Sequence, residues 1–366
     1  MSHEKEVLEG KLLKRLGIEN VTVWVGVLAW RGRSGKIVGN KKLFAELQEA
    51  LLPCGGISYI MTPHQSIEND WLKGYLYIPS EDSWIFAEFP IPDVIYNRVP
   101  FYHNEKEQCF IQFRESAKQK GIPFFNSHFL DKWSTYKLLS ARTSIQNFLP
   151  ETLEVTNEEA CLQFLKTHIC IYAKPKLKSK GFGVMRIRLK HDGKIYCETT
   201  STTILFANFE RFWERFHTTF EKNQYILQQA IEPKTYKGRR FDLRVLGQYN
   251  GTTYEVTGIG VRQSFHQEIT THVPRGGRII PLSAVEHLVP AKSIEQLVID
   301  IGEELNKDSG LFYEFSIDMG LDEEHTPYIF EVNAKPMTFD EKEIESTRME
   351  LLSKLCLTLS KQGPTT

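Results

Sequence analysis

The stretch "YEFSIDMGLDEEHTPYIFEVNAKP", Tyr313–Pro336, predicts two strands joined by a polar turn. Because side chains alternate between the two faces of a strand, Glu331 and Asn333 are expected on one face and Phe330 on the other. If the two strands pair as a hairpin, Asp318 of the first strand comes near Glu331 and Asn333 of the second. The hairpin therefore predicts a cluster of two carboxylates and one amide.

Such a cluster has two interpretations. Two carboxylates about 4 Å apart repel each other by roughly 1 kcal/mol even in water, and a divalent cation removes that repulsion. Oxygen ligands from Asp, Glu and Asn suit Mg²⁺, which also keeps waters and binds nucleotide phosphates. In the alternative, the three side chains are solvent-facing polar positions of an amphipathic hairpin. The hairpin alone leaves both interpretations open.

A second predicted strand, "RRFDLRVL" at Arg239–Leu246, presents Asp242 and Arg244 on one face, because they are two residues apart. After an Asn-Gly turn, Arg262 falls on the partner strand. The guanidinium fork fits two oxygens of a phosphoryl group or a carboxylate at once. An exposed cross-strand ion pair is the common alternative.

A third stretch, "IYAKPKLKSKGFGV" at Ile171–Val184, begins like a strand and ends like a glycine-containing turn. Its lysines fit a loop that grips phosphate, but they fit a solvated basic hairpin equally well. These residues alone do not distinguish the two.

Composition limits the class of protein. The 366 residues exceed the usual size of one core, which predicts two or three domains or lobes. The 45 Lys and Arg against 46 Asp and Glu leave a formal charge of -1, so no overall attraction to nucleic acid or acidic membranes is expected. The 6 cysteines include no C-x-x-C pair, which fits a reducing cytosol. The charged N-terminus and short apolar runs predict neither export nor membrane insertion.

The order of predicted elements changes along the chain. Up to about residue 127, strands such as "VTVWVGVLAW" alternate with helices such as "KKLFAELQEALLP", which predicts an α/β lobe with a partly parallel sheet. Beyond it, hairpins dominate, with turns predicted at Asp192–Gly193 and Asn250–Gly251. This part is expected to be α+β with mostly antiparallel strands.

Other motifs give weaker indications of function. "GRSGK" at Gly32–Lys36 lacks the first glycine and the final Ser or Thr of a P-loop. His266 and His272 have no metal-ligand partner at helical spacing and are interpreted as surface histidines. Asn97 and Arg98 end a predicted strand and are a candidate substrate contact, with a loop ion pair as the alternative.

The order of six motifs resembles the ATP-grasp superfamily. The motifs are "DKW" at Asp131–Trp133, "YAKPK…GFGV" around Lys174, "ILQQAIE" around Gln228, "DLR" at Asp242–Arg244, Asp318, and "FEVNAKP" ending at Pro336. With "PDVIYNRV" and "LPET" as well, the chain resembles the endospore-coat-associated YheC/YheD branch over about residues 20–350. The resemblance implies an α/β N-terminal lobe at 1–127 and an α+β ATP-grasp fold at 128–366. Nucleotide would bind between subdomains 128–228 and 229–366.

The resemblance also implies roles in binding ATP. Lys132 matches a lysine that contacts the nucleotide, with Lys137 as its substitute, and Lys174 matches a second such lysine. The loop Ser179–Gly183 would close over the phosphates, whereas Lys176 and Lys178 are expected to be solvated. The residues implied for this loop and for the base and ribose pocket are Ser179, Gly181, Gly183, Gln228, Gln229, Ala230, Ile231 and, as the ribose acceptor, Glu232.

The remaining implied roles concern metal and substrates. Mg²⁺, or Mn²⁺ in its place, is expected on Asp318, Glu331 and Asn333. Arg244 and Arg262 match the groups that stabilise the transferred phosphoryl and an acyl phosphate. A carboxylate substrate is expected at the segment Arg275, Gly276 and Gly277.

The implied activity is that of an Mg-ATP-dependent ligase, in which a carboxylate becomes an acyl phosphate and an amine then displaces phosphate. The alternative is a nucleotide-binding assembly protein of the spore coat without turnover, with coat proteins as partners. Neither nucleic acid nor membrane is an expected partner, and the expected location is the cytoplasm, with spore association. The chain departs from many relatives at Lys335 and at Gln228, where several relatives carry glutamate, and neither residue is an expected metal ligand.

Overall fold

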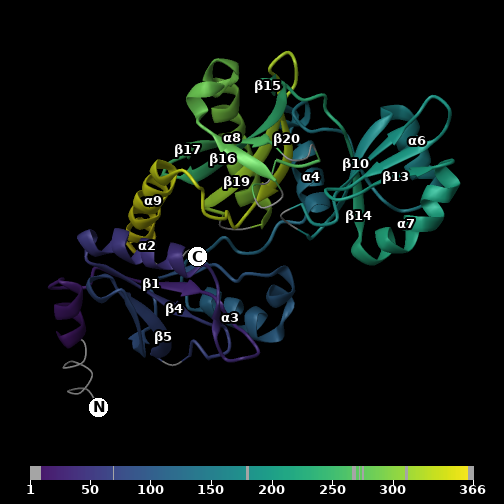
Figure 1. The fold of residues 1–366 in the computed structure, drawn as a ribbon. Coiled ribbons are helices and arrows are strands. Elements are labelled where there is room, and N and C mark those ends of the chain that lie inside the picture. Colours follow the sequence, from purple (N-terminus) through teal and green to yellow (C-terminus); the bar gives the residue numbers. More distant parts are fainter. Residues whose placement is uncertain are drawn as a thin grey trace.

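Three six-stranded sheets follow one another along the part of the chain that the computed structural model describes (Figure 1). The described residues are 10–68, 70–178, 181–265, 269–271, 273, 276–309 and 312–361. Smaller elements are the ribbon of β2 (Trp30–Arg31) with β3 (Ile37–Val38) and the 3₁₀ helices Leu52–Cys54, Pro79–Glu81, Tyr102–Lys106, Leu282–Ala284 and Glu286–Leu288.

The first sheet has the strand order β6-β5-β4-β1-β7-β8. Its strands are β1 (Val23–Leu28), β4 (Gly56–Met61), β5 (Trp71–Ile78), β6 (Ser83–Pro90), β7 (Val94–Asn97) and β8 (Phe124–Phe125). The helix α2 (Lys41–Leu51) joins the parallel pair β1 and β4, and α3 (Gln108–Gln119) joins the parallel pair β7 and β8. The antiparallel pair β5–β6 completes the sheet, so the prediction of an α/β lobe with a partly parallel sheet is confirmed.

The second sheet is antiparallel, with the order β13-β12-β11-β10-β14-β9. Its strands are β9 (Thr152–Glu154), β10 (Cys170–Pro175), β11 (Met185–Leu189), β12 (Ile195–Glu198), β13 (Thr203–Phe206) and β14 (Tyr225–Gln229). The helices α6 (Glu158–His168) and α7 (Phe209–Asn223) pack their apolar side chains into one core with this sheet. The Asp-Gly turn predicted between β11 and β12 is present, with Gly193 at φ +79°.

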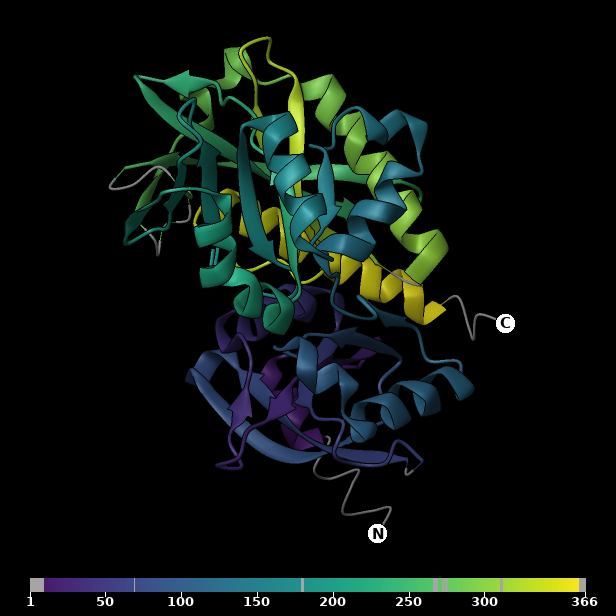
Figure 2. The ribbon, with the colours of Figure 1, turned by 90° about the vertical axis from the view of Figure 1, so that its right-hand side faces the viewer.

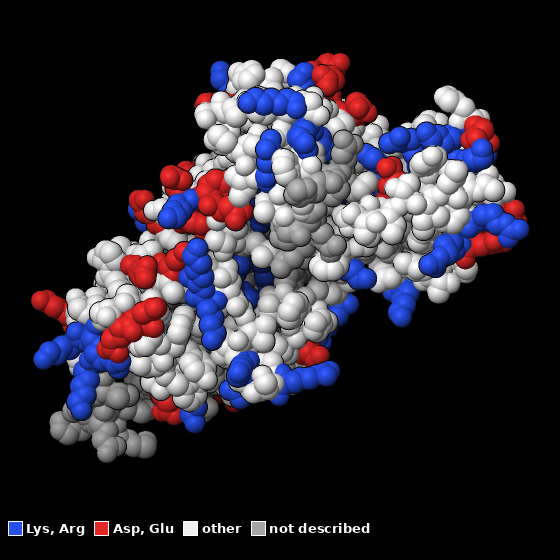
Figure 3. Space-filling model, viewed as in Figure 1, with Lys and Arg blue, Asp and Glu red and all other residues white. Residues whose placement is uncertain are grey.

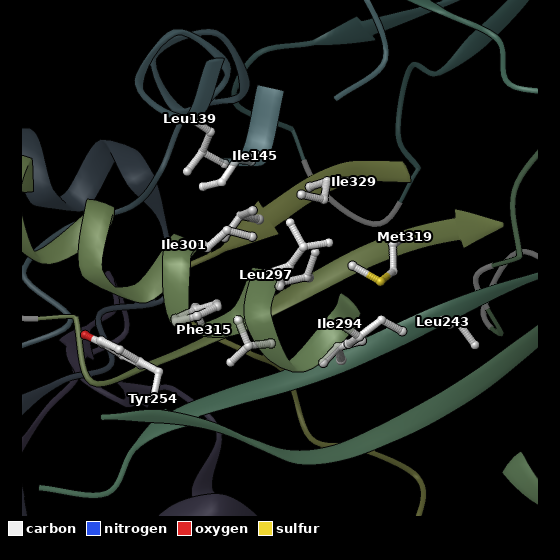
Figure 4. Close-up of a cluster of buried hydrophobic side chains, with 14 of the residues drawn as sticks. Leu139, Ile145, Leu243, Tyr254, Ile294, Leu297, Ile301, Phe315, Met319 and Ile329 are labelled. Carbon is white, nitrogen blue, oxygen red and sulfur yellow. The ribbon is translucent and has the colours of Figure 1, made fainter. Parts of the chain in front are cut away.

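The third sheet has the order β18-β17-β16-β19-β20, with β15 paired to β16. Its elements are β15 (Thr235–Tyr236), β16 (Arg239–Tyr249), β17 (Tyr254–Ser264), β18 (Gly277–Ile280), β19 (Glu314–Leu321), β20 (Pro327–Asn333) and the covering helices α4 (Lys132–Ser140), α5 (Thr143–Gln146) and α8 (Ala291–Ser309). Figure 4 shows Leu139 and Ile145, from α4 and α5, beside Ile301 of α8 over this sheet. Helices α4 and α5 thus pack on the third sheet, although they precede the second in the chain.

The C-terminal helix α9 (Lys342–Lys361) returns to the first sheet. Its residues Met349, Leu352 and Cys356 share one core with α2 and β1. Figures 1 and 2 both place α9 between the first and third sheets. None of the described helices combines the length and the apolar composition that a membrane crossing needs.

A buried polar network also joins the first lobe to the third sheet. Arg348 of α9 is fully buried and donates two hydrogen bonds to Glu314 of β19, at 2.9 and 2.7 Å. Arg98, at the end of β7, pairs with the same carboxylate at 3.4 Å and donates to the carbonyl of Pro336 at 2.9 Å. Arg98 is therefore a structural link between the lobes, and it is not placed as a substrate contact.

Candidate functional site

An open cavity lies between the second and third sheets. It encloses about 950 Å³, including its mouth, and side chains from α4, β10, β14, β16, β17, β19 and β20 line it. Figure 3 shows a hollow near the centre of the molecule with basic side chains inside it. The expected site residues that line the cavity are Lys132, Lys174, Gly181, Gln228, Gln229, Ile231, Arg244, Arg262, Asp318 and Glu331.

Two lysines enter the cavity from opposite elements. Lys174, near the end of β10, donates to the Gln228 side-chain oxygen at 2.5 Å and lies over the Phe330 ring. Burial lowers the pKa of Lys174 to about 8, although the charge of Glu331 opposes the shift. Lys132, in the first turn of α4, lies 3.0 Å from Glu331 and donates to the carbonyl of Lys178 at 2.8 Å. Two positive groups are therefore presented to one ligand.

Two other lysines that were considered from the sequence, Lys137 and Lys176, do not line the cavity. Lys137 is exposed on α4 and lies over the Trp133 ring, so Lys132 is the lysine of this helix that faces the cavity. Lys176 is not solvated as expected, because its ammonium group pairs with Glu154 of β9. Strand alternation would place Lys174 and Lys176 on one face, but β10 ends at Pro175, so Lys176 no longer follows the strand and its ammonium group turns to Glu154.

The hairpin of β19 and β20 brings the expected carboxylates together. Asp318 and Glu331 are direct partners in the register, and the Asn333 amide lies 3.5 Å from the Asp318 carboxylate. In this structure cations compensate both carboxylates: Lys132 pairs with Glu331, and Arg262 lies 3.9 Å from Asp318. Among the described residues, no group of three or more His, Cys, Asp or Glu side chains could hold a metal. Two carboxylates and one amide are nevertheless oxygen donors that fit Mg²⁺.

The expected alternation of β20 is wrong at Phe330. The register passes from Asp318–Glu331 to Met319–Ile329, so Phe330 is an extra residue and forms a β-bulge. Phe330 therefore lines the cavity beside Glu331 instead of facing the other way. A bulge depends on the pairing of two strands, and the one-strand pattern contains no signal for it.

The strand β16 contributes more than the sequence prediction assigned to it. Arg240, Asp242 and Arg244 follow one another at a spacing of two on the cavity face. Arg240 donates to the Tyr172 hydroxyl at 2.9 Å, and Thr271 donates to Asp242 at 2.6 Å. The same spacing that predicted Arg244 would have included Arg240. The cavity-lining residues that were not assigned from sequence are Tyr172, Pro175, Lys178, Val184, Pro233, Arg240, Asp242, Leu243, Ile269, Thr270, Thr271 and Phe330.

Arg244 and Arg262 lie on neighbouring strands beside the carboxylates. Arg244 pairs in register with Asp318 across β16 and β19, and Arg262 pairs with Asp242 across β16 and β17. Burial lowers the pKa of Arg244 to about 10, while Asp318 opposes the shift. The Arg244 guanidinium contacts the chain after β20, through the Met337 carbonyl at 3.4 Å and the Phe339 ring. With this pKa, the Arg244 guanidinium is still positively charged at neutral pH.

Several expected residues lie elsewhere. Glu232 is exposed and does not line the cavity, although its neighbours Ile231 and Pro233 do, so its side chain is directed away from the cavity wall. Asp242 is a carboxylate that does line the cavity. Gly183 packs against Tyr225, whose hydroxyl donates to its carbonyl at 2.9 Å. The expected residues that are described but do not line the cavity are Gly183, Ala230, Glu232, Gly276, Gly277 and Asn333. Ser179 and Arg275 lie outside the described residues, as do His266 and His272.

Comparison with known proteins identifies a family whose model matches this chain. The model of a family described as "YheC/D like ATP-grasp" matches residues 121–359. The endospore coat-associated protein YheD of Bacillus subtilis (strain 168) is 25% identical over 309 residues, which are 80% of this chain and 67% of YheD. The endospore coat-associated protein YheC of the same organism is 24% identical over 301 residues, which are 77% of this chain and 81% of YheC.

The fold has a solved counterpart. The structure of VanG D-Ala:D-Ser ligase from Enterococcus faecalis superposes with a TM-score of 0.54 at 15% identity, over 93% of this chain and 100% of that one. At this identity the likeness concerns the fold alone. It extends over both the α/β lobe and the α+β part that follows.

Proposed function

The chain belongs to the YheC/D-like ATP-grasp family, and from this membership we propose that it is an ATP-dependent ligase that joins a carboxylate to an amine. One observation carries the proposal. A single cavity is lined by three lysines, three arginines and the paired carboxylates Asp318 and Glu331. This combination suits a bound polyphosphate and the transfer of its terminal phosphoryl group, which requires positioning and neutralisation of charge.

ATP would lie with its base at the end of β14 and its phosphates toward the third sheet. Gln229 and Ile231 line the cavity there and carry main-chain groups for the base edge. Phe330 supplies an apolar surface beside them. Lys174 and Lys132 would then contact the phosphates, and Asp242 replaces Glu232 as the acidic group available to a ribose hydroxyl.

The metal would be held by Asp318, Glu331 and Asn333. Bound there, Mg²⁺ or Mn²⁺ would neutralise charge on the phosphates. For Glu331 to serve as a ligand, Lys132 must give up or share the 3.0 Å ion pair that it makes in this structure. Phosphate groups offer Lys132 a replacement partner.

The reaction would proceed in two displacements. A carboxylate oxygen forms a bond to the γ-phosphorus while the bond to the bridging oxygen breaks, and ADP leaves with the electron pair. An uncharged amine nitrogen then bonds to the acyl carbon, the carbon–oxygen bond breaks, and one proton of the nitrogen goes to the departing phosphate. Arg244 and Arg262, which line the cavity, would stabilise the oxygens that gain charge in both steps.

Two measurements test this function. ADP with Mg²⁺ should raise the melting temperature, since a ligand at 100 times its Kd stabilises the folded state by about 2.7 kcal/mol. Release of ADP and phosphate across a panel of carboxylates and amines should then reveal turnover, which Glu331→Ala should abolish. The absence of stabilisation by ADP would contradict nucleotide binding.

A second function has one observation in its favour. Both bacterial relatives are named as endospore coat-associated proteins. A nucleotide-binding protein that assembles with spore-coat proteins, without turnover, would fit those names. Stabilisation by ADP together with no release of phosphate across the whole panel would favour this second function over the ligase.

A further inference from the structure

A carboxylate outside the nucleotide cavity is packed onto the same face of the third sheet. The Glu341 side chain lies over Gly260 of β17, so closely that a Cβ atom at Gly260 would be 3.0 and 3.1 Å from its two carboxylate oxygens. A glycine at this position therefore makes room for the carboxylate. Gly260 does not have a positive φ, so its backbone alone does not require glycine.

The strand register places this carboxylate beside the two arginines of the site. Gly260 pairs with Arg244 across β16 and β17, and Arg262 lies two residues further along β17. Positions i and i+2 share a face and are about 7 Å apart along the strand. Glu341 thus borders the arginine side of the cavity, where the acyl phosphate would form.

The segment that carries Glu341 is held at both ends. Arg244 contacts the Met337 carbonyl and the Phe339 ring, and the Asn40 side chain of the first lobe donates to Thr338 at 2.8 Å. After Glu341 the chain enters α9, with the Glu345 amide donating to the Glu341 carbonyl at 3.3 Å. The main chain that carries Glu341 is therefore held beside Arg244.

The surroundings of Glu341 leave its carboxylate available to bind a ligand. The side chain is only partly buried, and within the described part of the chain its carboxylate makes no hydrogen bond or ion pair. A negative charge over Gly260 would repel the anionic groups that the arginines attract, but it would attract a cation. A primary ammonium ion is the cation that a carboxylate–amine ligase must admit.

We propose that Glu341 receives the ammonium group of the acceptor, which is therefore a primary amine that is protonated at neutral pH. This role rests on the proposed ligase function. Glu341 would hold the ammonium ion on the arginine side of the cavity, so that the site selects amines over neutral or anionic acceptors. The ammonium group would pass one proton to the Glu341 carboxylate before its nitrogen bonds to the acyl carbon. Gly260 serves as the positioning residue, because it allows Glu341 to reach the sheet.

The test uses the complete protein saturated with ADP and Mg²⁺. The probes are glycinamide, a small primary ammonium ion, and acetamide, its uncharged counterpart, with binding followed by the additional rise in melting temperature. Glycinamide should stabilise the wild-type complex more than acetamide does. Glu341→Gln should weaken glycinamide binding by about tenfold or more, because a charge-assisted hydrogen bond is lost.

Two further variants separate position from charge. Gly260→Ala keeps the carboxylate but displaces it, so it should weaken glycinamide binding in the same way as Glu341→Gln. Glu343→Gln removes an exposed charge two residues along α9 and should leave glycinamide binding unchanged. All variants should retain stabilisation by ADP, because neither Glu341 nor Gly260 lines the nucleotide cavity.

The outcomes distinguish the two proposals. Equal effects of glycinamide and acetamide on the wild-type complex, or an unchanged glycinamide effect in Glu341→Gln, would overturn the role of Glu341 while nucleotide binding stands. The absence of any stabilisation by ADP would instead overturn the proposed function and this role with it.

Discussion

The ammonium group of Lys174 lies in a buried environment, and burial disfavours its positive charge. This ammonium group contacts Gln228, Tyr172 and Phe330, and Gln228 is a neutral partner. Burial lowers the pKa of Lys174 to about 8, which brings the loss of its charge into an accessible pH range. A bound phosphate would add a negative charge that favours the charged form of Lys174.

This pKa predicts how nucleotide binding depends on pH. Lys174 is charged below about pH 8, so affinity for ADP should be highest there and should fall by about tenfold between pH 7 and pH 9. Titration calorimetry over this range should show the loss in the wild-type protein. Lys174→Met should bind more weakly and lose this dependence, whereas Lys190→Met, on an exposed turn, should retain it.

As the pH rises, the contribution of Lys174 to the stability of the unliganded protein should change in the direction opposite to the change in ADP affinity. An unfolded lysine keeps its proton up to about pH 10.4, whereas folded Lys174 releases it near 8, so the unfolded state binds more protons between these values. The contribution of Lys174 to the free energy of unfolding therefore rises with pH across this window. A fall in both affinity and this contribution would contradict the assignment of the shift to burial.

At the scale of elements, the bulge in β20 decides which side chains of the hairpin face the nucleotide. Without the bulge, Phe330 would share the buried face of β20 with Val332. With it, an aromatic ring and a carboxylate from adjacent positions share the cavity. One strand can therefore contact the base side and the metal side of a nucleotide together.

Phe330→Ala should weaken ADP binding by about tenfold, or 1.4 kcal/mol, through loss of apolar contact. The dependence of ADP binding on Mg²⁺ should persist, because the expected metal ligands are unchanged. Tyr328→Ala alters the same strand outside the bulge and away from the cavity, so it should leave ADP affinity unchanged in the same calorimetric titration. Equal losses in the two variants would mean that the strand as a whole, and not the bulged ring, supports binding.

At the scale of the molecule, the buried network of Arg348, Glu314 and Arg98 ties the first lobe to β19, the first strand of the β19–β20 hairpin. Lys335, just after β20, adds a second link through an ion pair of 2.5 Å with Glu105. Lys335 thus has a structural role here. The first lobe and the β19–β20 hairpin are held as one unit.

Removal of one partner from this network should lower the free energy of unfolding. Arg348→Met leaves Glu314 buried without its main counter-charge, so the free energy of unfolding should fall by about 3–5 kcal/mol. Lys354→Met breaks an exposed ion pair with Glu350 on the same helix and should cost less than about 1 kcal/mol. Urea unfolding of the two variants measures both values, and similar small losses would show that the buried network does not stabilise the protein.

The sequence by itself determined the family, the strands of the hairpin and the residues that meet across it. Asp318, Glu331, Lys174 and Arg244 could be predicted because strand alternation and motif order are properties of nearby residues. The exposed position of Glu232 shows the limit of that reasoning, since the path of the chain after β14 depends on packing and not on the motif.

Only the tertiary structure decided the rest. Phe330 faces the cavity through a register shift between two strands, and Arg98 is buried because a helix from the far end of the chain carries Arg348 to the same carboxylate. Glu341 meets Gly260 across some eighty intervening residues. Each of these contacts joins segments that are distant in sequence, and local periodicity carries no information about which distant segments will pack together.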